Sequence, residues 1–420
     1  MKVVLLNTTE KTGGAAKACL RVFNALAKVL DVSLLVQDKS SDLPSIISVS
    51  ESKISKISAF LRFSIERLWV LTKIKKKDFL YSFSPANTGL DIKNHKEIGN
   101  ADIIHLHWIN FGFLSLKSLK KIVALKKPIV WTLHDMWAFT GGCHYSGECT
   151  NFKTGCGNCF YLKTCKPDDS SKKIWNKKMH IFKDANLTIV TSSNWLGRCA
   201  SNSQLFKTTT VKTIPTPIDS SVYKILDKNN CRKKLNLPTD KKLILFGCMN
   251  IEDERKGFRH LQNALKFYLK QFPDSLKDTE VVVFGKSSHI SLDIDFKIHS
   301  LGLINSEEKL VMVYNAADTF VLPSLEDNLP NTVMESMACG TPVTAFDLGG
   351  IPDMIEHQVD GYMAEPKNSV DLANGIHYIL TNQEALGMKA RQKMETYFNE
   401  SFVATQYTNL YKEILKTSKN

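Results

Sequence analysis

Several features that define whole classes of protein are missing from this sequence of 420 residues. No apolar run reaches the roughly 18 residues that a membrane-spanning helix needs, and the apolar start Val3-Val4-Leu5-Leu6 is too short for the core of a signal peptide. The first glycine turn, residues 8–14, lacks the Gly-x-Gly-x-x-Gly pattern of nicotinamide-binding enzymes. We therefore expect a cytoplasmic protein that is not a nicotinamide-dependent oxidoreductase.

Length and composition indicate a globular protein with more than one core. Hydrophobic residues make up 43% and charged residues 23% of the chain, which is typical of globular proteins. Since 420 residues exceed the usual size of a single core, two domains are expected. The ten cysteines should mostly be thiols in a reducing compartment, and a disulfide framework is the weaker interpretation.

The positive charge is concentrated in the first half of the chain. Residues 1–200 carry 30 Lys and Arg against 15 Asp and Glu, a net charge of +15, whereas the remainder has a net charge of −2. This asymmetry favours an anionic partner for the first half, such as a membrane surface, a phosphorylated lipid or a nucleic acid. A solvated basic face is the alternative.

Short β-branched runs alternate with longer helical patterns, which is typical of parallel α/β sheets. A segment with two prolines, 214–219, separates two such series, so we place the domains at 1–216 and 217–420. A last helical pattern, 383–415, could pack back on either domain, including the N-terminal one. The expected strands are 2–6, 31–36, 102–105, 128–133 and 187–191, then 243–246, 281–284, 319–322 and 342–345; the expected helices include 15–30, 257–270, 306–316, 331–338 and 369–380.

The stretch 322–342 carries two acids at the end of a predicted strand. Asp327 lies in the loop, and Glu335 lies one turn into the helix that opens near Asn331. Ligands of open α/β sheets bind at the carboxyl ends of strands, beside helix N-termini. The two acids could therefore line one binding site, although helix caps and dipole partners are the common alternative.

A second loop in this half delivers two adjacent cations, Arg255 and Lys256, at the start of a helix. Fixed cations neutralise a departing phosphate group without a metal ion. Two solvated basic side chains are the simpler interpretation.

These residues resemble the signature of a known protein family. The stretch from Pro323-Ser324 to Gly340-Thr341-Pro342, together with Arg255-Lys256-Gly257, resembles the signature of retaining glycosyltransferases of glycosyltransferase family 4, glycosyl transferases group 1. The resemblance extends over nearly all of both domains. It implies the GT-B fold, with two facing Rossmann-like domains and a cleft between them; the N-terminal domain would bind an acceptor and the C-terminal domain a nucleotide-sugar.

The resemblance also implies roles for single residues. Glu335 would hold the ribose, and Lys256 with Arg255 would hold the diphosphate. The acid beside the donor sugar would be Asp327, although Glu326 precedes it and the family usually has glutamate at this position. The donor site implied by the match further includes Asn328 and Leu329.

In the first domain the resemblance extends to the Gly13-Gly14 turn, which would approach the donor phosphates, and to His134, which would contact the donor sugar or the acceptor. Taken alone, the glycine pair need only be a turn and the histidine a structural residue.

The implied reaction is transfer of a hexosyl-type sugar from a nucleotide donor to a saccharide or lipid-linked saccharide, with retention of configuration and no required cofactor. It would serve the synthesis of a bacterial surface polysaccharide. A GT-B sugar-nucleotide epimerase or hydrolase is an alternative within the same fold. A basic, zinc-containing nucleic-acid-binding protein is an alternative of another class, which leaves Arg255, Lys256 and Glu335 unexplained.

The segment 51–77 combines apolar residues at helical spacing with many lysines. Such a basic amphipathic helix can lie on an anionic membrane, at the inner face of the cell membrane here. A helix whose apolar face packs in the core is the alternative.

Five cysteines gather in an insertion at 141–167, which is rich in glycine. Four thiolates on one zinc ion could hold this stretch together, or an iron–sulfur cluster on the same thiolates. Packed, reduced cysteines are the alternative. The candidate ligands are Cys143, Cys149, Cys156 and Cys159, with Cys165 as a further possibility.

Overall fold

The computed structural model describes residues 1–286 and 294–417, which form two compact units. The first unit comprises Met1–Thr216 and the chain from Val403 onward, and the second comprises Pro217–Phe402. The chain therefore leaves the first unit once and returns to it with its last helix. Each unit is described by itself.

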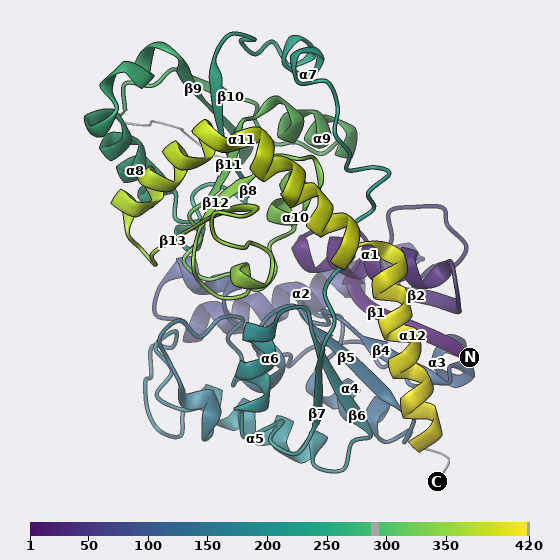
Figure 1. Ribbon diagram of the computed structural model, residues 1–420. Helices are drawn as coiled ribbons and strands as arrows, with labels where there is room; N and C mark the ends of the chain where they lie inside the picture. The colour runs from purple at the N-terminus through teal and green to yellow at the C-terminus, as the bar shows by residue number, and fades with distance from the viewer. Residues whose placement is uncertain (287–293, 418–420) are drawn as a thin grey trace. The chain divides into compact units, whose positions relative to one another are not determined.

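The first unit is built on a seven-stranded sheet in which every pair of neighbouring strands is parallel. The strand order is β3-β2-β1-β4-β5-β6-β7, so the direction of winding reverses between β1 and β4 (Figure 1). The loops beside such a reversal point form the binding crevice of open α/β sheets. The strands are β1 (Lys2–Thr9), β2 (Asp31–Asp38), β3 (Ile46–Ser48), β4 (Ile103–Leu106), β5 (Ile129–Leu133), β6 (Leu187–Thr191) and β7 (Thr210–Thr213).

Helices cover this sheet and include one from the far end of the sequence. Alternate residues of β1 enter two separate apolar cores: Val4 and Leu6 lie in one, Val3 and Leu5 in the other. The second core is completed by the last helix, α12 (Glu400–Thr417), shown in yellow in Figure 1. The other helices are α1 (Gly14–Ala27), α2 (Lys53–Lys73), α3 (Lys96–Asn100), α4 (Leu116–Val123), α5 (Ser170–Phe182) and α6 (Asn194–Ser201), with short 3₁₀ helices η1 (Lys77–Tyr81), η2 (Trp137–Phe139) and η3 (Asn151–Lys153).

The second unit has a six-stranded parallel sheet in the order β10-β9-β8-β11-β12-β13. Its strands are β8 (Lys242–Asn250), β9 (Thr279–Lys286), β10 (Ile298–Ser300), β11 (Thr319–Leu322), β12 (Val343–Phe346) and β13 (Gly361–Ala364). Its helices are α7 (Lys228–Lys234), α8 (Phe258–Gln271), α9 (Glu307–Ala316), α10 (Asn331–Ala338) and α11 (Ser369–Tyr397), with 3₁₀ helices η4 (Glu254–Lys256), η5 (Pro273–Lys277) and η6 (Ile351–Asp353).

The predicted fold class, two Rossmann-like domains with parallel sheets, is confirmed. The last helical pattern differs from the prediction, because it is divided between α11 and α12, and α11 has a non-helical residue at Asn382. Among the described residues, no helix has the length and apolar character needed to cross a bilayer.

Candidate functional site

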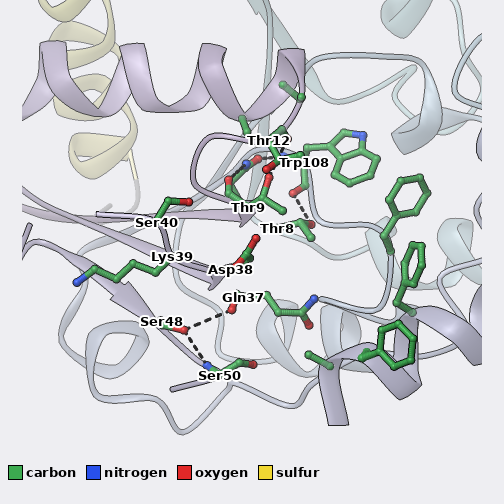
Figure 2. Close-up of a pocket in the computed structure, with 18 of the residues that line it drawn as sticks. Thr8, Thr9, Thr12, Gln37, Asp38, Lys39, Ser40, Ser48, Ser50 and Trp108 are labelled. Atoms are coloured by element: carbon green, nitrogen blue, oxygen red, sulfur yellow. Dashed lines mark hydrogen bonds between the residues drawn. The ribbon is translucent and has the colours of Figure 1, made fainter. Parts of the chain in front are cut away.

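A cavity of about 1220 Å³ opens at the carboxyl ends of the strands of the first unit. Its walls come from the ends of β1 and β2, with Thr8, Thr9, Gln37 and Asp38, and from the loop after β4, with Trp108 (Figure 2). Because the sheet is parallel, all these strand ends lie at one edge, beside the reversal between β1 and β4. The cavity is large enough for more than one sugar ring.

The predicted glycine turn forms part of this cavity. Gly13 and Gly14 both line it, and α1 begins at Gly14. Gly13 has φ +95°, a backbone conformation that other residues rarely adopt, so glycine suits this turn into the helix. The turn directs the N-terminal end of α1, with its partial positive charge, at the cavity.

Aromatic rings form a wall of the same cavity, namely Phe60 and Phe63 of α2, Tyr81, Trp108 and Phe111. Phe111 makes edge contacts with three of them, at ring centroid distances of 4.6 Å to Trp108 and 5.9 Å to Phe63 and Tyr81. The same cavity is also lined by hydroxyl and carboxylate groups, those of Asp38, Ser40, Ser41, Asp42, Ser48, Ser50 and Glu51. Aromatic faces beside hydroxyl-binding groups suit the two sides of a sugar ring.

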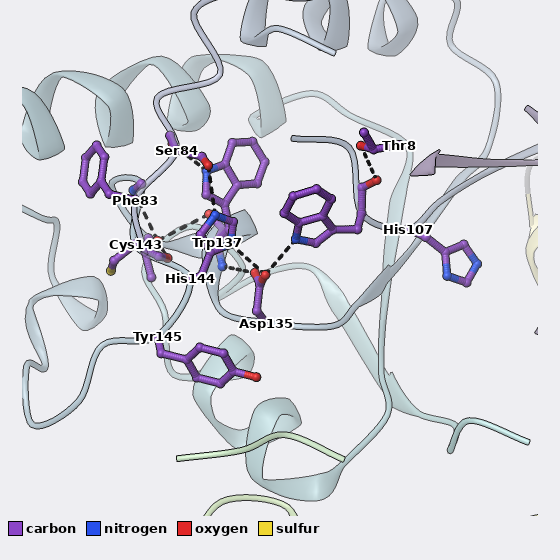
Figure 3. Close-up of polar contacts among 12 residues, drawn as sticks. Thr8, Phe83, Ser84, His107, Asp135, Trp137, Cys143, His144 and Tyr145 are labelled. Atoms are coloured by element: carbon purple, nitrogen blue, oxygen red, sulfur yellow. Dashed lines mark hydrogen bonds and ion pairs between the residues drawn. The ribbon is translucent and has the colours of Figure 1, made fainter. Parts of the chain in front are cut away.

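Asp135, which follows β5, connects several residues of the cavity wall (Figure 3). Its Oδ2 accepts hydrogen bonds from Trp108 Nε1 at 2.9 Å and pairs with His144 Nδ1 at 2.7 Å. Its Oδ1 accepts the Trp137 backbone N–H at 2.8 Å. Burial alone would raise the pKa of Asp135, but His144 and these hydrogen bonds outweigh it and hold the pKa below its ordinary value. His144 Nε2 in turn lies 2.9 Å from Ser84 Oγ, so this wall is held from both sides.

The structure places the predicted residue His134 differently from its neighbour Asp135. His134 is half-buried, and its Nε2 lies 3.0 Å from Nδ1 of His107. It is not among the residues that line the large cavity. Burial lowers the pKa of His134 to about 4, with Asp135 acting in the opposite direction. His134 is therefore neutral at pH 7 and continues a buried histidine network.

The second unit brings Arg255, Lys256 and Asp327 together. Lys256 Nζ donates to Asp327 Oδ2 at 2.6 Å, and Arg255 Nη1 lies 3.7 Å from the same oxygen. Arg255 Nη1 also donates to the backbone carbonyl of Glu326 at 2.9 Å. Burial would raise the pKa of Asp327, but Lys256 and then Arg255 hold it below its ordinary value. The carboxylate that faces the two cations is thus that of Asp327.

Close backbone packing positions this cluster. Gly257 follows Lys256 with φ +71°, and a Cβ there would lie 1.8 Å from the carbonyl oxygen of Pro323 at the end of β11. The Leu325 N–H donates to the Arg255 carbonyl at 2.8 Å. Only glycine lets the basic turn approach the acidic loop so closely.

Glu335 lies on α10, is 1% exposed, and accepts a hydrogen bond from the Tyr314 hydroxyl at 3.0 Å. The structure therefore points at least one of its carboxylate oxygens into the unit. Asn328 donates its backbone N–H to Asp327 Oδ1 at 3.2 Å, and Leu329 packs in the apolar core.

The cysteines of the insertion at 141–167 are divided between the apolar core and the surface. Cys143, Cys156 and Cys159 lie in the apolar core of the first unit, Cys149 is half-buried, and Cys165 is exposed. In residues 1–286 and 294–417, no group of three or more His, Cys, Asp or Glu side chains is arranged to hold a metal ion. None of these five cysteines forms a disulfide, and the Cys156 Sγ accepts a hydrogen bond from the Gly141 N–H at 3.0 Å.

Comparison with known proteins agrees with this geometry. Residues 12–222 match the family described as Glycosyltransferase Family 4, and residues 240–382 match Glycosyl transferases group 1. The chain belongs to glycosyltransferase family 4. It spans about half the length of the curated family members that it matches first.

One relative of this family 4 chain is the N,N'-diacetylbacillosaminyl-diphospho-undecaprenol alpha-1,3-N-acetylgalactosaminyltransferase of Campylobacter jejuni subsp. jejuni serotype O:2. It is 31% identical over 161 residues, covering 35% of this chain and 42% of the relative. Sucrose-phosphate synthase from Thermosynechococcus elongatus has a similar fold, with a TM-score of 0.68, 18% identity and 99% of both chains covered. So does Anabaena Alr3699/HepE in complex with UDP-glucose, with a TM-score of 0.61, 14% identity, and 98% of this chain and 100% of that chain covered.

Sequence reasoning missed the wall of the large cavity. Trp108 lies two residues after β4, so its place at a strand end could have indicated it. His144 lies in the irregular cysteine-rich segment, where no periodicity links it to Asp135. The aromatic residues of α2 are part of a helical pattern whose spacing alone does not say which side faces the cavity.

Proposed function

We propose that this protein is a retaining glycosyltransferase that transfers a sugar from a nucleotide-sugar to a saccharide or lipid-linked saccharide, in the synthesis of a bacterial surface polysaccharide. The observation that carries the proposal is the contact of Lys256 and Arg255 with Asp327 at the ends of β8 and β11. It supports the proposal because two cations that suit a diphosphate lie beside an acid that suits a sugar hydroxyl. The name of the Campylobacter relative and the UDP-glucose named with the Anabaena protein support the substrate classes.

In this proposal Lys256 and Arg255 stabilise the leaving diphosphate while the transition state acquires oxocarbenium character. Fixed cations need no reorganisation at the moment of reaction and supply the charge that a metal ion would otherwise supply, so the transfer requires no cofactor. Asp327 orients the sugar, with Asn328 and Leu329 beside it. Glu335 binds the ribose hydroxyls after exchanging its contact with Tyr314.

The large cavity of the first unit is the proposed acceptor site. Its aromatic wall stacks on the apolar face of the sugar, and the hydroxyl-rich side holds its polar groups. Asp135 and His144 fix that wall, and Gly13-Gly14 present the N-terminal end of α1 to anionic groups. Outside this cavity, His134 acts as a neutral hydrogen-bonding group toward the donor sugar. The departing phosphate takes the acceptor proton, and the new bond forms on the face that the diphosphate leaves.

Donor specificity is the test. The full chain is mixed with UDP-, GDP- and ADP-sugars, and thermal stabilisation and slow release of nucleoside diphosphate are measured. One donor should stabilise the protein, and Lys256→Ala should abolish the release. The product on a saccharide acceptor should keep the anomeric configuration of the donor in an NMR spectrum.

Other outcomes would overturn the proposal in distinct ways. Release of nucleotide that never requires an acceptor, with a free sugar as the product, would indicate the epimerase or hydrolase class. Salt-dependent binding of DNA or RNA without any donor effect would indicate the nucleic-acid-binding class. The cytoplasmic location is part of the same proposal.

A further inference from the structure

Helix α2 exposes apolar side chains along one whole side. Five of these residues expose between half and four-fifths of their surface: Ile54 80%, Leu68 62%, Ile57 60%, Ile65 54% and Leu61 52%. At 100° per residue these positions fall within one narrow stripe of the helix. The alternative given above, an apolar face packed in the core, does not hold for these residues.

Three charged residues in the middle of α2 turn inward, away from the stripe. Glu66 and Arg67 are buried and paired at 2.5 Å, and Arg67 also donates to the carbonyl of Phe83 at 3.2 Å. Arg62 donates to the carbonyl of Gly112 at 2.9 Å and to Gln37 Oε1 at 2.9 Å. A helix on a water-facing surface normally has the reverse arrangement. The outer stripe is thus an exposed apolar patch of the kind that marks an interaction site.

Lysines flank the stripe at both ends. Lys53 and Lys56 are exposed near its start, and Lys73 and the run 75–77 are exposed at its end. The exposed acids in this stretch are Glu51 and Asp78, so cations outnumber acids. The same end is held by the cysteine-rich insertion, because Ile74 forms a bridge with Leu162. That insertion adds a partly exposed aromatic ring, Phe160, and a further cation, Lys163.

The stripe borders the proposed acceptor cavity. Lys56, Ala59, Phe60 and Phe63 of α2 all line that cavity, and Phe60 is still 66% exposed. One helix therefore presents an apolar surface outward and an aromatic wall to the cavity.

We propose that α2 lies in the interface of an anionic phospholipid bilayer, with the stripe Ile54, Ile57, Leu61, Ile65 and Leu68 inserted at the level of the acyl chains. The flanking lysines bind the lipid phosphates, which is the charge complement of a negative membrane surface. A lipid-linked acceptor then keeps its lipid in the bilayer while its sugar enters the cavity beside Phe60. This last step rests on the proposed function, whereas the membrane contact does not.

Vesicle flotation of the full chain tests the membrane contact. The wild-type protein should float with vesicles of phosphatidylcholine and phosphatidylglycerol at low salt, and binding should fall with added salt and with phosphatidylcholine alone. The triple variant Ile57→Ser, Leu61→Ser, Ile65→Ser should lower vesicle binding by at least about a hundredfold, since each aliphatic side chain contributes roughly tenfold. None of these three residues lines the acceptor cavity, so transfer to a water-soluble saccharide should be unchanged.

A matched control replaces three exposed apolar residues elsewhere, Val29→Ser, Leu276→Ser and Met388→Ser, and should bind vesicles like the wild type.

Wild-type protein that does not bind anionic vesicles, or a stripe variant that still binds them, would overturn the proposal. A wild-type dimer that the stripe variant converts to a monomer would assign the stripe to a second copy of the chain. A lowered unfolding midpoint in the stripe variant would show that the stripe is packed within the protein. Vesicle binding without any sugar transfer would leave the membrane contact standing and refute the proposed function alone.

Discussion

Replacing Asp327 with Asn should tighten the binding of free nucleoside diphosphate and weaken sugar transfer. Asp327 balances Lys256 at 2.6 Å and Arg255 at 3.7 Å, and Arg255 also pairs with Asp253 at 3.4 Å. A diphosphate must therefore compete with these acids for the two cations. Asp327 is buried, so its pairing is screened less than that of a surface ion pair.

The magnitude follows from these distances. Unit charges at about 3 Å attract by roughly 5 kcal/mol at an effective dielectric constant of about 20, and most of this is offset by desolvation. If the loss of the Asp327 charge makes diphosphate binding more favourable by about 1.4 kcal/mol, the dissociation constant falls tenfold. We expect a tenfold lower dissociation constant for the diphosphate of the preferred donor in Asp327→Asn, measured by titration calorimetry, together with a fall of kcat by a factor on the order of 100.

Asp253→Asn is the matched control, because the Asp253 carboxylate pairs with Arg255 at 3.4 Å and is more exposed than that of Asp327. Its effect on diphosphate binding should be less than threefold, as for partly exposed ion pairs. Unchanged or weaker diphosphate binding in Asp327→Asn would refute the reasoning that the acid restrains the cations.

Three further predictions concern other parts of the molecule. Lys256→Ala should mainly lower kcat and Glu335→Ala should mainly raise donor KM, because one contacts charge that develops in the transition state and the other a ground-state hydroxyl; equal effects on the same parameter would contradict these roles. Burial lowers the pKa of His105 to about 3, so the neutral side chain stabilises the fold fully above about pH 6.5, and this contribution is lost as the pH falls toward 3. Urea titrations should therefore give a free energy of unfolding that is about 2 kcal/mol lower at pH 5 than at pH 7, and His105→Asn should show a smaller difference. The zinc hypothesis for segment 141–167 predicts about one zinc per chain by elemental analysis, and an active enzyme with less than about a tenth of an equivalent of metal would leave a loop held by packing.

The sequence predicted the inner strands of both sheets, because buried, β-branched runs bounded by turn residues are typical of strands. α10 matches its predicted range, 331–338, since Pro330 marks its start and Gly340 follows its end. The four edge strands, β3, β7, β10 and β13, were missed, because each has only three or four residues and none is a continuous buried run.

The site was predicted less completely for a physical reason. The contact of Lys256 with Asp327 joins loops 71 residues apart, and only the resemblance to a family brought these residues into one site. Glu66 and Arg67 of α2 face inward because they have partners there, such as the carbonyl of Phe83. A hydropathy pattern does not reveal such partners. The family match could name residues but not the Tyr314 contact of Glu335.

The return of α12 to the first unit has a consequence for the order of folding during synthesis. Tyr411 binds His105 at 2.7 Å, Tyr407 lies 2.9 Å from Thr132 Oγ1, and both pack in the core that contains Val3 and Leu5. A ribosome releases the N-terminal strands first, yet their core stays incomplete until the last helix emerges. The second unit, which is contiguous in sequence, can finish folding before the first. The domain made first is thus the domain completed last, and the core around Val3 and Leu5 stays open until α12 has been synthesised.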